Sequence, residues 1–233
     1  MIFSRKYDTM SVTKPGCCQQ IFGRRQIRIA VSAAEGIKDT NRDMMCKGDS
    51  EMEKKKLIIF TDSGDTLIDE GSEIRKVKDG VVYEAQFIPG AKETLLELKE
   101  RGYQIALVAD GLKESFDRIY ARHHLEDVFD AQAISEVVGE EKPSPAMFET
   151  AMRKLGLGET DKKRILMVGN NIKRDIVGAN RFGIHSVLLT WSPRYHMISE
   201  TVEETPEFRI SRPEELLGVI EKLEETWEVS ERK

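Results

Sequence analysis

Residues 57–68 read Leu-Ile-Ile-Phe-Thr-Asp-Ser-Gly-Asp-Thr-Leu-Ile, and this stretch decides the fold. Its apolar start, residues 57–60, predicts a buried strand that ends at a polar, glycine-containing loop. The loop carries two carboxylates, Asp62 and Asp65, with the hydroxyl of Thr66 beside them. Carboxylates at the carboxyl end of a parallel strand lie where open α/β sheets bind ligands. Taken by itself the loop is also typical of an ordinary Asx turn, so the rest of the chain decides between the two interpretations.

Downstream of this loop, predicted strands alternate with predicted helices. The strands are expected over residues 57–60, 104–109, 131–134, 164–168 and 186–190, and the helices over residues 90–101, 113–122, 145–155, 172–181 and 213–225. This alternation predicts an α/β fold in which a Rossmann-like parallel sheet is sandwiched by helices. Because crossovers between parallel strands are right-handed, the strand-to-helix loops should meet at one edge of the sheet.

The same pattern divides the chain into three segments. Residues 1–56 show no sustained periodicity and are expected to form a disordered N-terminal extension, residues 57–225 the folded domain, and residues 226–233 a C-terminal tail. The extension carries an excess of positive charge, but it is too poor in clustered basic and aromatic residues to predict a nucleic-acid partner. The expected domain boundary is therefore at Leu57.

Composition and cysteine content indicate the compartment. The 233 residues are 39% apolar and 33% charged with a net charge of −5, and no apolar run is long enough to span a bilayer, so no membrane partner is expected. The cysteines, Cys17, Cys18 and Cys46, have no metal-ligand spacing. A cytoplasmic location is the simplest expectation.

Four loops at the predicted sheet edge carry groups suited to phosphate chemistry. They contain Asp62; Asp110 and Gly111; Lys142; and Asn170 with Asp175. Carboxylate oxygens of Asp62 and Asp175 are ligands that Mg²⁺ prefers, and Lys142 could neutralise a phosphoryl oxygen. Backbone N–H groups around Gly111 could bind phosphate oxygens. Each residue alone has an ordinary structural explanation, such as an exposed lysine or a helix-capping side chain, but the ordered set of four is hard to obtain by accident.

The ordered set resembles the haloacid dehalogenase-like hydrolase superfamily over residues 57–189. In that family an Asp-x-Asp-x-Thr pattern follows the first strand, and its first aspartate attacks the phosphoryl group; counting back from Thr66 places this nucleophile at Asp62. The family's lysine matches Lys142, and its Gly-Asp…Asp-x-x-Gly-Ala block matches residues 169–179. The resemblance implies a Mg²⁺ cofactor held by Asp62, the Gly64 carbonyl, Asn170 and Asp175, and phosphate contacts from Asp110, Gly111 and Lys142.

Three positions depart from the family pattern. Gly64 replaces the aspartate that acts as the general acid, Ala109 replaces a phosphate-binding Ser or Thr, and Asn170 replaces the first acidic ligand of the last block. General acid–base assistance is typically worth about 10²–10⁴-fold in rate. The loss at Gly64 therefore predicts slow hydrolysis of alkyl phosphates and a smaller penalty for acyl or aryl phosphates. Asp65 is a poor substitute for this acid, because it is displaced by one residue and its side chain should point elsewhere; it could instead serve the metal's outer shell.

The resemblance thus implies a Mg²⁺-dependent phosphatase that acts on a small phosphorylated substrate through an aspartyl-phosphate. A catalytically weak or inactive module that binds a phosphorylated ligand is the main alternative, favoured by the changes at Gly64 and Ala109. Carbon–halogen cleavage is a third, in which Gly64 would be harmless. Only residues 69–87 separate the first loop from the next predicted helix, which leaves room for a flap but no large cap domain. Such an open site could be covered by a second copy of the chain in a homodimer.

Overall fold

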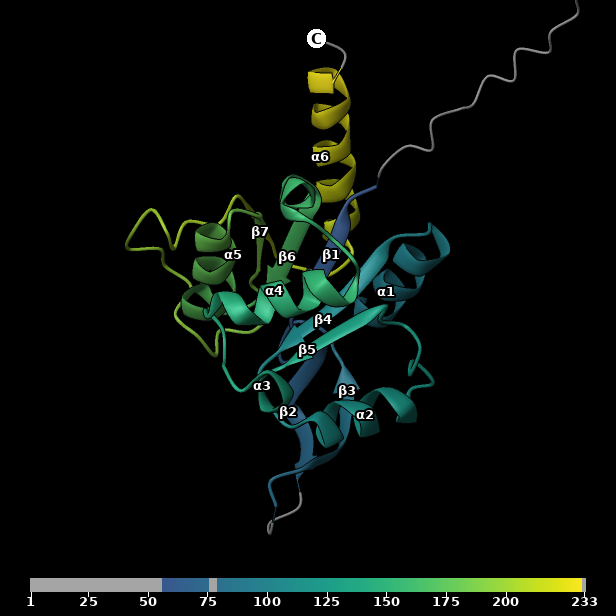
Figure 1. The fold of residues 1–233 in the computed structure, drawn as a ribbon. Coiled ribbons are helices and arrows are strands. Elements are labelled where there is room, and N and C mark those ends of the chain that lie inside the picture. The colour runs from purple at the N-terminus through teal and green to yellow at the C-terminus, as the bar shows by residue number, and fades with distance from the viewer. Residues whose placement is uncertain (1–55, 76–78, 232–233) are drawn as a thin grey trace, which may run out of the picture. The chain divides into compact units, whose positions relative to one another are not determined.

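The computed structural model describes residues 56–75 and 79–231, which lie in a compact unit spanning Met52–Lys233 (Figure 1). Its centre is a parallel sheet of six strands in the order β5-β4-β1-β6-β7-β8. The strands are β1 (Ile58–Thr61), β4 (Gln104–Ala109), β5 (Ala131–Ile134), β6 (Ile165–Gly169), β7 (His185–Leu189) and β8 (Phe208–Ile210). This topology confirms the predicted α/β fold with a parallel sheet. The predicted extension, residues 1–56, lies outside the described residues except for Lys56.

Helices cover both faces of the sheet, and strand β1 shows why. Its side chains alternate between the faces, as the pleat of a strand requires. Ile59 belongs to the core shared with α1, α2 and α6, whereas Ile58 and Phe60 belong to the core shared with α4 and α5. All three are at most 1% exposed. The helices are α1 (Ala91–Glu100), α2 (Lys113–Arg122), α4 (Pro145–Lys154), α5 (Val177–Phe182) and α6 (Glu215–Glu231).

Several shorter elements were not predicted. The segment between β1 and α1 forms an antiparallel hairpin of β2 (Ile68–Arg75) and β3 (Val82–Phe87), which matches the expected flap without a large cap domain. Most of β2 is polar and half-buried or exposed, so it lacks the apolar alternation that marks a strand in a sequence. The others are strand β8, helix α3 (Ser135–Val138) and a 3₁₀-helix η1 (Glu159–Arg164). The helix predicted over residues 172–181 is present, but it begins as a π-helix, η2 (Ile172–Ile176), before it continues as α5.

The last helix is longer than predicted. It runs to Glu231, so the predicted helix end at residue 225 is wrong, and the division into a domain and a C-terminal tail from residue 226 stays a prediction. The helix continues because its apolar spacing does: Leu216, Ile220 and Leu223 line the core, and Trp227 follows at the next helical interval. The hydroxyl of Thr226 also donates to the carbonyl of Lys222, a bond within the helix.

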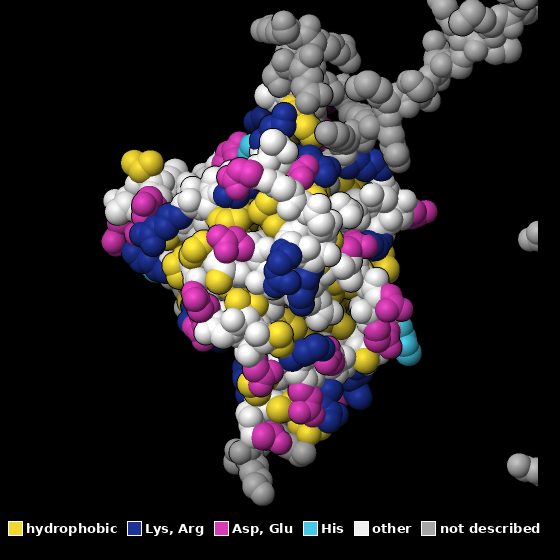
Figure 2. All heavy atoms as spheres, viewed as in Figure 1, with side chains coloured by type: hydrophobic (Ala, Val, Ile, Leu, Met, Phe, Trp, Pro, Cys, Tyr) yellow, Lys and Arg dark blue, Asp and Glu magenta, His cyan; other side chains and the backbone are white. Residues whose placement is uncertain are grey.

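The surface of the described part is mixed in character. Figure 2 shows basic and acidic side chains interspersed over the visible face, with apolar atoms between them. Among the described residues, no helix combines the length and the apolar character that crossing a bilayer would require.

Candidate active site

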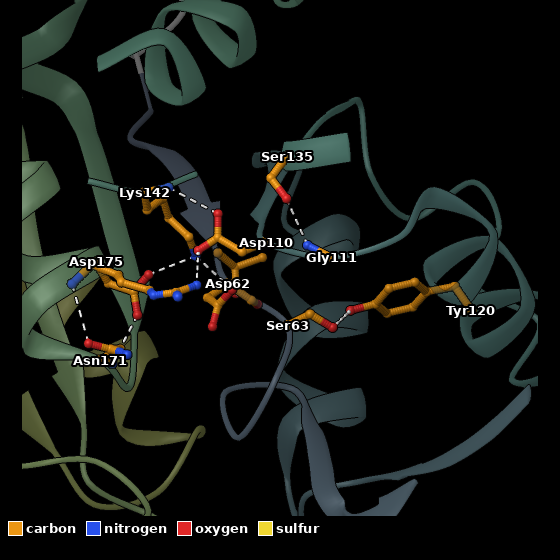
Figure 3. Close-up of polar contacts among 11 residues, drawn as sticks. Asp62, Ser63, Asp110, Gly111, Tyr120, Ser135, Lys142, Asn171 and Asp175 are labelled. Atoms are coloured by element: carbon orange, nitrogen blue, oxygen red, sulfur yellow. Dashed lines mark hydrogen bonds and ion pairs between the residues drawn. The ribbon is translucent and has the colours of Figure 1, made fainter. Parts of the chain in front are cut away.

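The predicted site residues meet at the carboxyl ends of three neighbouring strands. Asp62 follows β1, Asp110 follows β4, and Asn170 follows β6 at the central positions of the sheet. Lys142 arrives from the loop between α3 and α4, and Asp175 from the π-helix after β6. Figure 3 shows the side chains of Asp62, Lys142 and Asp175 pointing toward one another. They meet because all parallel strands of the sheet end at the same edge.

The Lys142 ammonium lies between two carboxylates. Its Nζ is 2.7 Å from Asp62 Oδ1 and 2.8 Å from Asp175 Oδ1. The side chains of Lys142 and Asp175 are 1% and 0% exposed, so these charges are removed from water. Burial by itself would lower the pKa of Lys142, but the carboxylates of Asp175 and Asp62 outweigh it and raise the pKa above its ordinary value. The lysine is therefore a permanent cation that offsets two buried carboxylates.

Asp62 is the most exposed of these three side chains, all of which line a cavity. Its side chain is 14% exposed, and burial raises its pKa although Lys142 opposes the shift. The loop that carries it is anchored on both sides, since the Asp62 N–H donates to the Val168 carbonyl and Ser63 Oγ lies 2.9 Å from the Tyr120 hydroxyl on α2. The carboxylate is thus held at a fixed position at the end of β1.

Asp175 depends on a glycine for its position. A Cβ atom on Gly169, the last residue of β6, would lie 2.7 Å from Asp175 Cβ and closer still to its carboxylate. Asp175 Oδ2 accepts a hydrogen bond of 2.9 Å from the Asn171 N–H, and Asn171 Oδ1 in turn caps the π-helix by accepting from the N–H groups of Lys173 and Arg174. Single-turn π-helices are frequent at functional sites, where the extra residue redirects a side chain.

Asp110 and Gly111 contact the site differently from the expectation. The Asp110 carboxylate accepts the Lys142 backbone N–H at 3.0 Å and pairs with Arg174 Nη1 at 3.0 Å, so it positions two cations, and its negative charge would repel a phosphate. The Gly111 N–H donates to Ser135 Oγ at 2.9 Å. Phosphate contacts from this loop therefore stay a prediction. Arg174, the residue before Asp175, is an additional cation at the site that no sequence motif indicates.

The donor set suits Mg²⁺ in its chemistry. Among the described residues no cluster of three or more His, Cys, Asp or Glu side chains forms a dedicated metal cage. Mg²⁺, however, is usually held by one or two carboxylates together with waters and substrate phosphate. Asp62 and Asp175 would supply the carboxylates, and the carbonyl of Gly64 and the amide of Asn170 could add neutral oxygens. Asn170 is 1% exposed and its amide nitrogen has no hydrogen-bond partner; because this NH₂ group is a donor, an acceptor such as a phosphoryl oxygen would complete it, and not the cation itself.

Asp65 makes contacts that its position in the sequence does not indicate. It is fully buried at a positive φ of 46°, and its Oδ2 lies 2.5 Å from Nε of Arg194. Its Oδ1 accepts the Glu70 N–H at 3.0 Å. Asp65 therefore joins the nucleophile loop to the hairpin and to the segment after β7, and a place in the metal's outer shell stays a prediction. The partner Arg194 is remote in sequence, so no local pattern could have identified this contact.

A polar cavity opens over these groups. All of the predicted site residues except Gly111 line it, together with Glu70, Asn171, Arg174 and Tyr195, which are not among the predicted site residues. Burial raises the pKa of Glu70, and the carboxylate of Asp65 raises it further while Arg194 opposes the shift. Tyr195 belongs to the stretch that follows β7, and burial raises the pKa of its hydroxyl as well. Most of the predicted residues thus line this cavity together with Glu70 of the hairpin and Tyr195 of the stretch after β7.

Three comparisons with known proteins bear on this site. The family model of the haloacid dehalogenase-like hydrolases matches residues 13–183, which extends upstream of the described residues. A glyceraldehyde 3-phosphate phosphatase of Methanopyrus kandleri is 34% identical over 139 residues, which are 58% of this chain and 57% of that protein. A ribulose-1,5-bisphosphate 5-phosphatase of Halopiger xanaduensis is 35% identical over 105 residues, 45% of this chain and 43% of that protein. The chain thus spans about half the length of these curated relatives.

A solved structure supports the fold independently. The HAD-hydrolase YfnB from Bacillus subtilis, bound to magnesium, superposes with a TM-score of 0.59 over 72% of this chain and 99% of that one, at 16% identity. At this identity the likeness concerns the fold alone. The sheet order, the strand-end site and the match over residues 13–183 lead to one conclusion: the chain belongs to the haloacid dehalogenase-like hydrolase family.

Proposed function

We propose that this chain is a Mg²⁺-dependent phosphatase that acts on small phosphorylated substrates through an aspartyl-phosphate on Asp62. The observation that carries the proposal is the Lys142 ammonium held 2.7 Å from Asp62 and 2.8 Å from Asp175 at the floor of a polar cavity. A carboxylate fixed at a strand end beside a permanent cation is suited to attack phosphorus while the developing charge is offset.

The chain's own residues then have distinct tasks. A carboxylate oxygen of Asp62 forms a bond to phosphorus as the leaving oxygen departs, and water later hydrolyses the aspartyl-phosphate and regenerates Asp62. Lys142 holds the Asp62 carboxylate in place and offsets negative charge. Arg174, which is 44% exposed at the cavity, can bind the oxygens of the incoming phosphoryl group. Bound Mg²⁺, held by Asp62, Asp175, Asn170 and the Gly64 carbonyl, would supply further electrostatic stabilisation of the phosphoryl oxygens.

The names of the relatives support a small phosphorylated substrate. Glyceraldehyde 3-phosphate and ribulose 1,5-bisphosphate are phosphate esters of alcohols on short carbon chains. Both relatives share only part of their length with this chain, so the substrate class is an inference for this protein. Coverage of the open site by a second copy of the chain and a cytoplasmic location also stay predictions.

The proposal is tested by a panel of phosphate esters assayed with Mg²⁺ and with a chelator. We expect turnover of p-nitrophenyl phosphate, acetyl phosphate or glyceraldehyde 3-phosphate that disappears on chelation and returns with Mg²⁺. Asp62→Asn should abolish it, because the amide is a far weaker nucleophile, whereas Asp117→Asn on the surface of α2 should not. Turnover that survives Asp62→Asn would exclude the covalent route.

A binding module is the second candidate, favoured by Gly64, Ala109 and Asn170 at positions where the family pattern has reactive or acidic groups. Calorimetry with inorganic phosphate and with the same esters separates the two candidates. Saturable binding without hydrolysis of any ester in the presence of Mg²⁺ would support the module and exclude the phosphatase.

A further inference from the structure

The space next to Gly64, where a side chain would lie, is occupied by the carboxyl group of Glu70. A Cβ atom built on Gly64 would lie 2.9 Å from Glu70 Cδ and 3.1 Å from Glu70 Cγ, and closer still to Oε1, so any side chain there would overlap with the carboxyl group of Glu70. Glu70 thus places its acid group in the space that a side chain at residue 64 would use. It reaches this space from the hairpin strand β2, six positions along the chain.

The position of Glu70 is fixed by several contacts. Its backbone N–H donates to Asp65 Oδ1 at 3.0 Å, and its Oε2 lies 3.3 Å from Nε of Arg194. Arg194 also pairs with Asp65, so one guanidinium holds both carboxylates. The hairpin is tied to the nucleophile loop by backbone bonds from the Asp65 N–H to the Ile68 carbonyl at 2.6 Å and from the Ile68 N–H to the Ser63 carbonyl at 2.9 Å. Loop and hairpin therefore act as one unit.

Glu70 also faces the reacting groups. Its side chain is 25% exposed and lines the same cavity as Asp62 and Lys142. Two neighbouring carboxylates do not qualify for the same task. Asp65 is fully buried against Arg194, and Glu73, further along β2, does not line this cavity and pairs with Arg75. Glu70 is thus the acidic group of the hairpin that a bound phosphate ester would meet.

We propose that Glu70 replaces the missing acid at Gly64 and exchanges the proton with the leaving group. The inference rests on the proposed phosphatase function and assigns the catalytic residue that its first step lacks. It also changes the expected substrate range: with a proton donor in place, esters of alcohols become suitable substrates, and the restriction to acyl or aryl phosphates no longer follows from Gly64.

The proton balance of the two steps is complete with this residue. In the first step an Asp62 oxygen bonds to phosphorus, the bond from phosphorus to the leaving oxygen breaks, and the protonated Glu70 carboxyl gives its proton to that oxygen to release the alcohol. In the second step a water attacks phosphorus, its proton passes to the Glu70 carboxylate, and the bond to Asp62 breaks to release inorganic phosphate. Both carboxyl groups return to their starting forms.

The test compares Glu70→Gln with the wild type across esters whose leaving groups differ in basicity. We expect kcat/KM for glycerol 3-phosphate to fall by about 10²–10⁴-fold, the usual contribution of a general acid. For p-nitrophenyl phosphate, whose leaving group needs no proton, kcat/KM should fall by only a few-fold. Glu73→Gln on the same hairpin is the matched control and should leave both values near those of the wild type. Thermal unfolding of each variant checks that the hairpin is intact.

A relocated acid provides the second arm. Glu70→Ala empties the space, and adding Gly64→Asp to it places a carboxyl group there from the loop. The double variant should recover at least about tenfold of the alkyl phosphate activity that Glu70→Ala loses, since part of the general acid's contribution returns.

The outcomes separate the two proposals. A wild type that hydrolyses p-nitrophenyl phosphate but no alkyl phosphate, or a Glu70→Gln variant that loses both substrates equally, overturns the role of Glu70 and leaves the phosphatase proposal standing. A wild type inactive on every ester overturns both. A selective loss on the alkyl ester supports the inference.

Discussion

The two sides of the cavity are built in different ways. On the nucleophile side, Asp62, Lys142 and Asp175 lie at the ends of the main sheet and form a buried charge cluster. On the leaving-group side, Glu70 comes from the hairpin and Arg194, which is 40% exposed, from the segment after β7, and both contact Asp65 of the nucleophile loop. The comparison indicates that the attacking group is fixed by the core of the fold, whereas the group facing the leaving oxygen is set by elements outside the main sheet.

Lys142→Met is the strongest test of the nucleophile side. It leaves the carboxylates of Asp62 and Asp175 buried without their cation, which typically costs about 3–5 kcal/mol. We expect a large drop in the free energy of unfolding in urea together with loss of phosphatase activity. Lys113→Met on α2, where the lysine is 49% exposed, is the control and should change stability very little. A stable Lys142→Met variant would show that the charge cluster is not a structural unit.

Gly169→Ala tests how tightly the same side is packed. The added methyl group would lie 2.7 Å from Asp175 Cβ and overlap its carboxylate, so either β6 or the π-helix must shift. Overpacking of this kind costs about 1–3 kcal/mol. Because Asp175 holds Lys142 in place, phosphatase activity should decrease together with the free energy of unfolding. Gly218→Ala on α6, where a Cβ meets no atom within 4 Å, serves as the comparison and should be neutral or stabilising in chemical denaturation.

Arg194→Met tests the leaving-group side and should have the smallest effect on stability. The arginine is partly exposed, so solvent screens its pairing with Asp65 and the expected loss is about 1–2 kcal/mol. The substitution should affect substrate choice more than stability. Glu70 would lose its contact with Arg194 and keep only the backbone hydrogen bond to Asp65. Relative kcat/KM for alkyl and aryl esters should shift toward the aryl ester. An unchanged ratio would mean that the backbone bond from Glu70 to Asp65 suffices to hold the hairpin.

The sequence predicts the main sheet and its strand-end residues better than the elements outside the sheet. The strands over residues 104–109 and 131–134 were predicted with the bounds observed, because buried parallel strands are continuous apolar runs. The structure brings together Asp62, Lys142 and Asp175, which the sequence places next to predicted strands or helices. The hairpin was missed because its strand β2 is mostly polar, and the pairing of Asp65 with Arg194 joins positions 129 residues apart. The identity of the group beside Gly64 could only come from a three-dimensional structure.

The charge cluster has a consequence for how the chain folds. Lys142 is separated by 80 positions from Asp62 and by 33 from Asp175, and each side chain becomes favourable to bury only when the others are present. A partly folded chain that docks β1 and β6 without the loop carrying Lys142 would trap two like charges away from water. Folding of the sheet centre should therefore be coupled to docking of that loop. Native-state hydrogen exchange should then show the amides of β1, β6 and the Lys142 loop opening together, and earlier exchange of the loop alone would argue against this coupling.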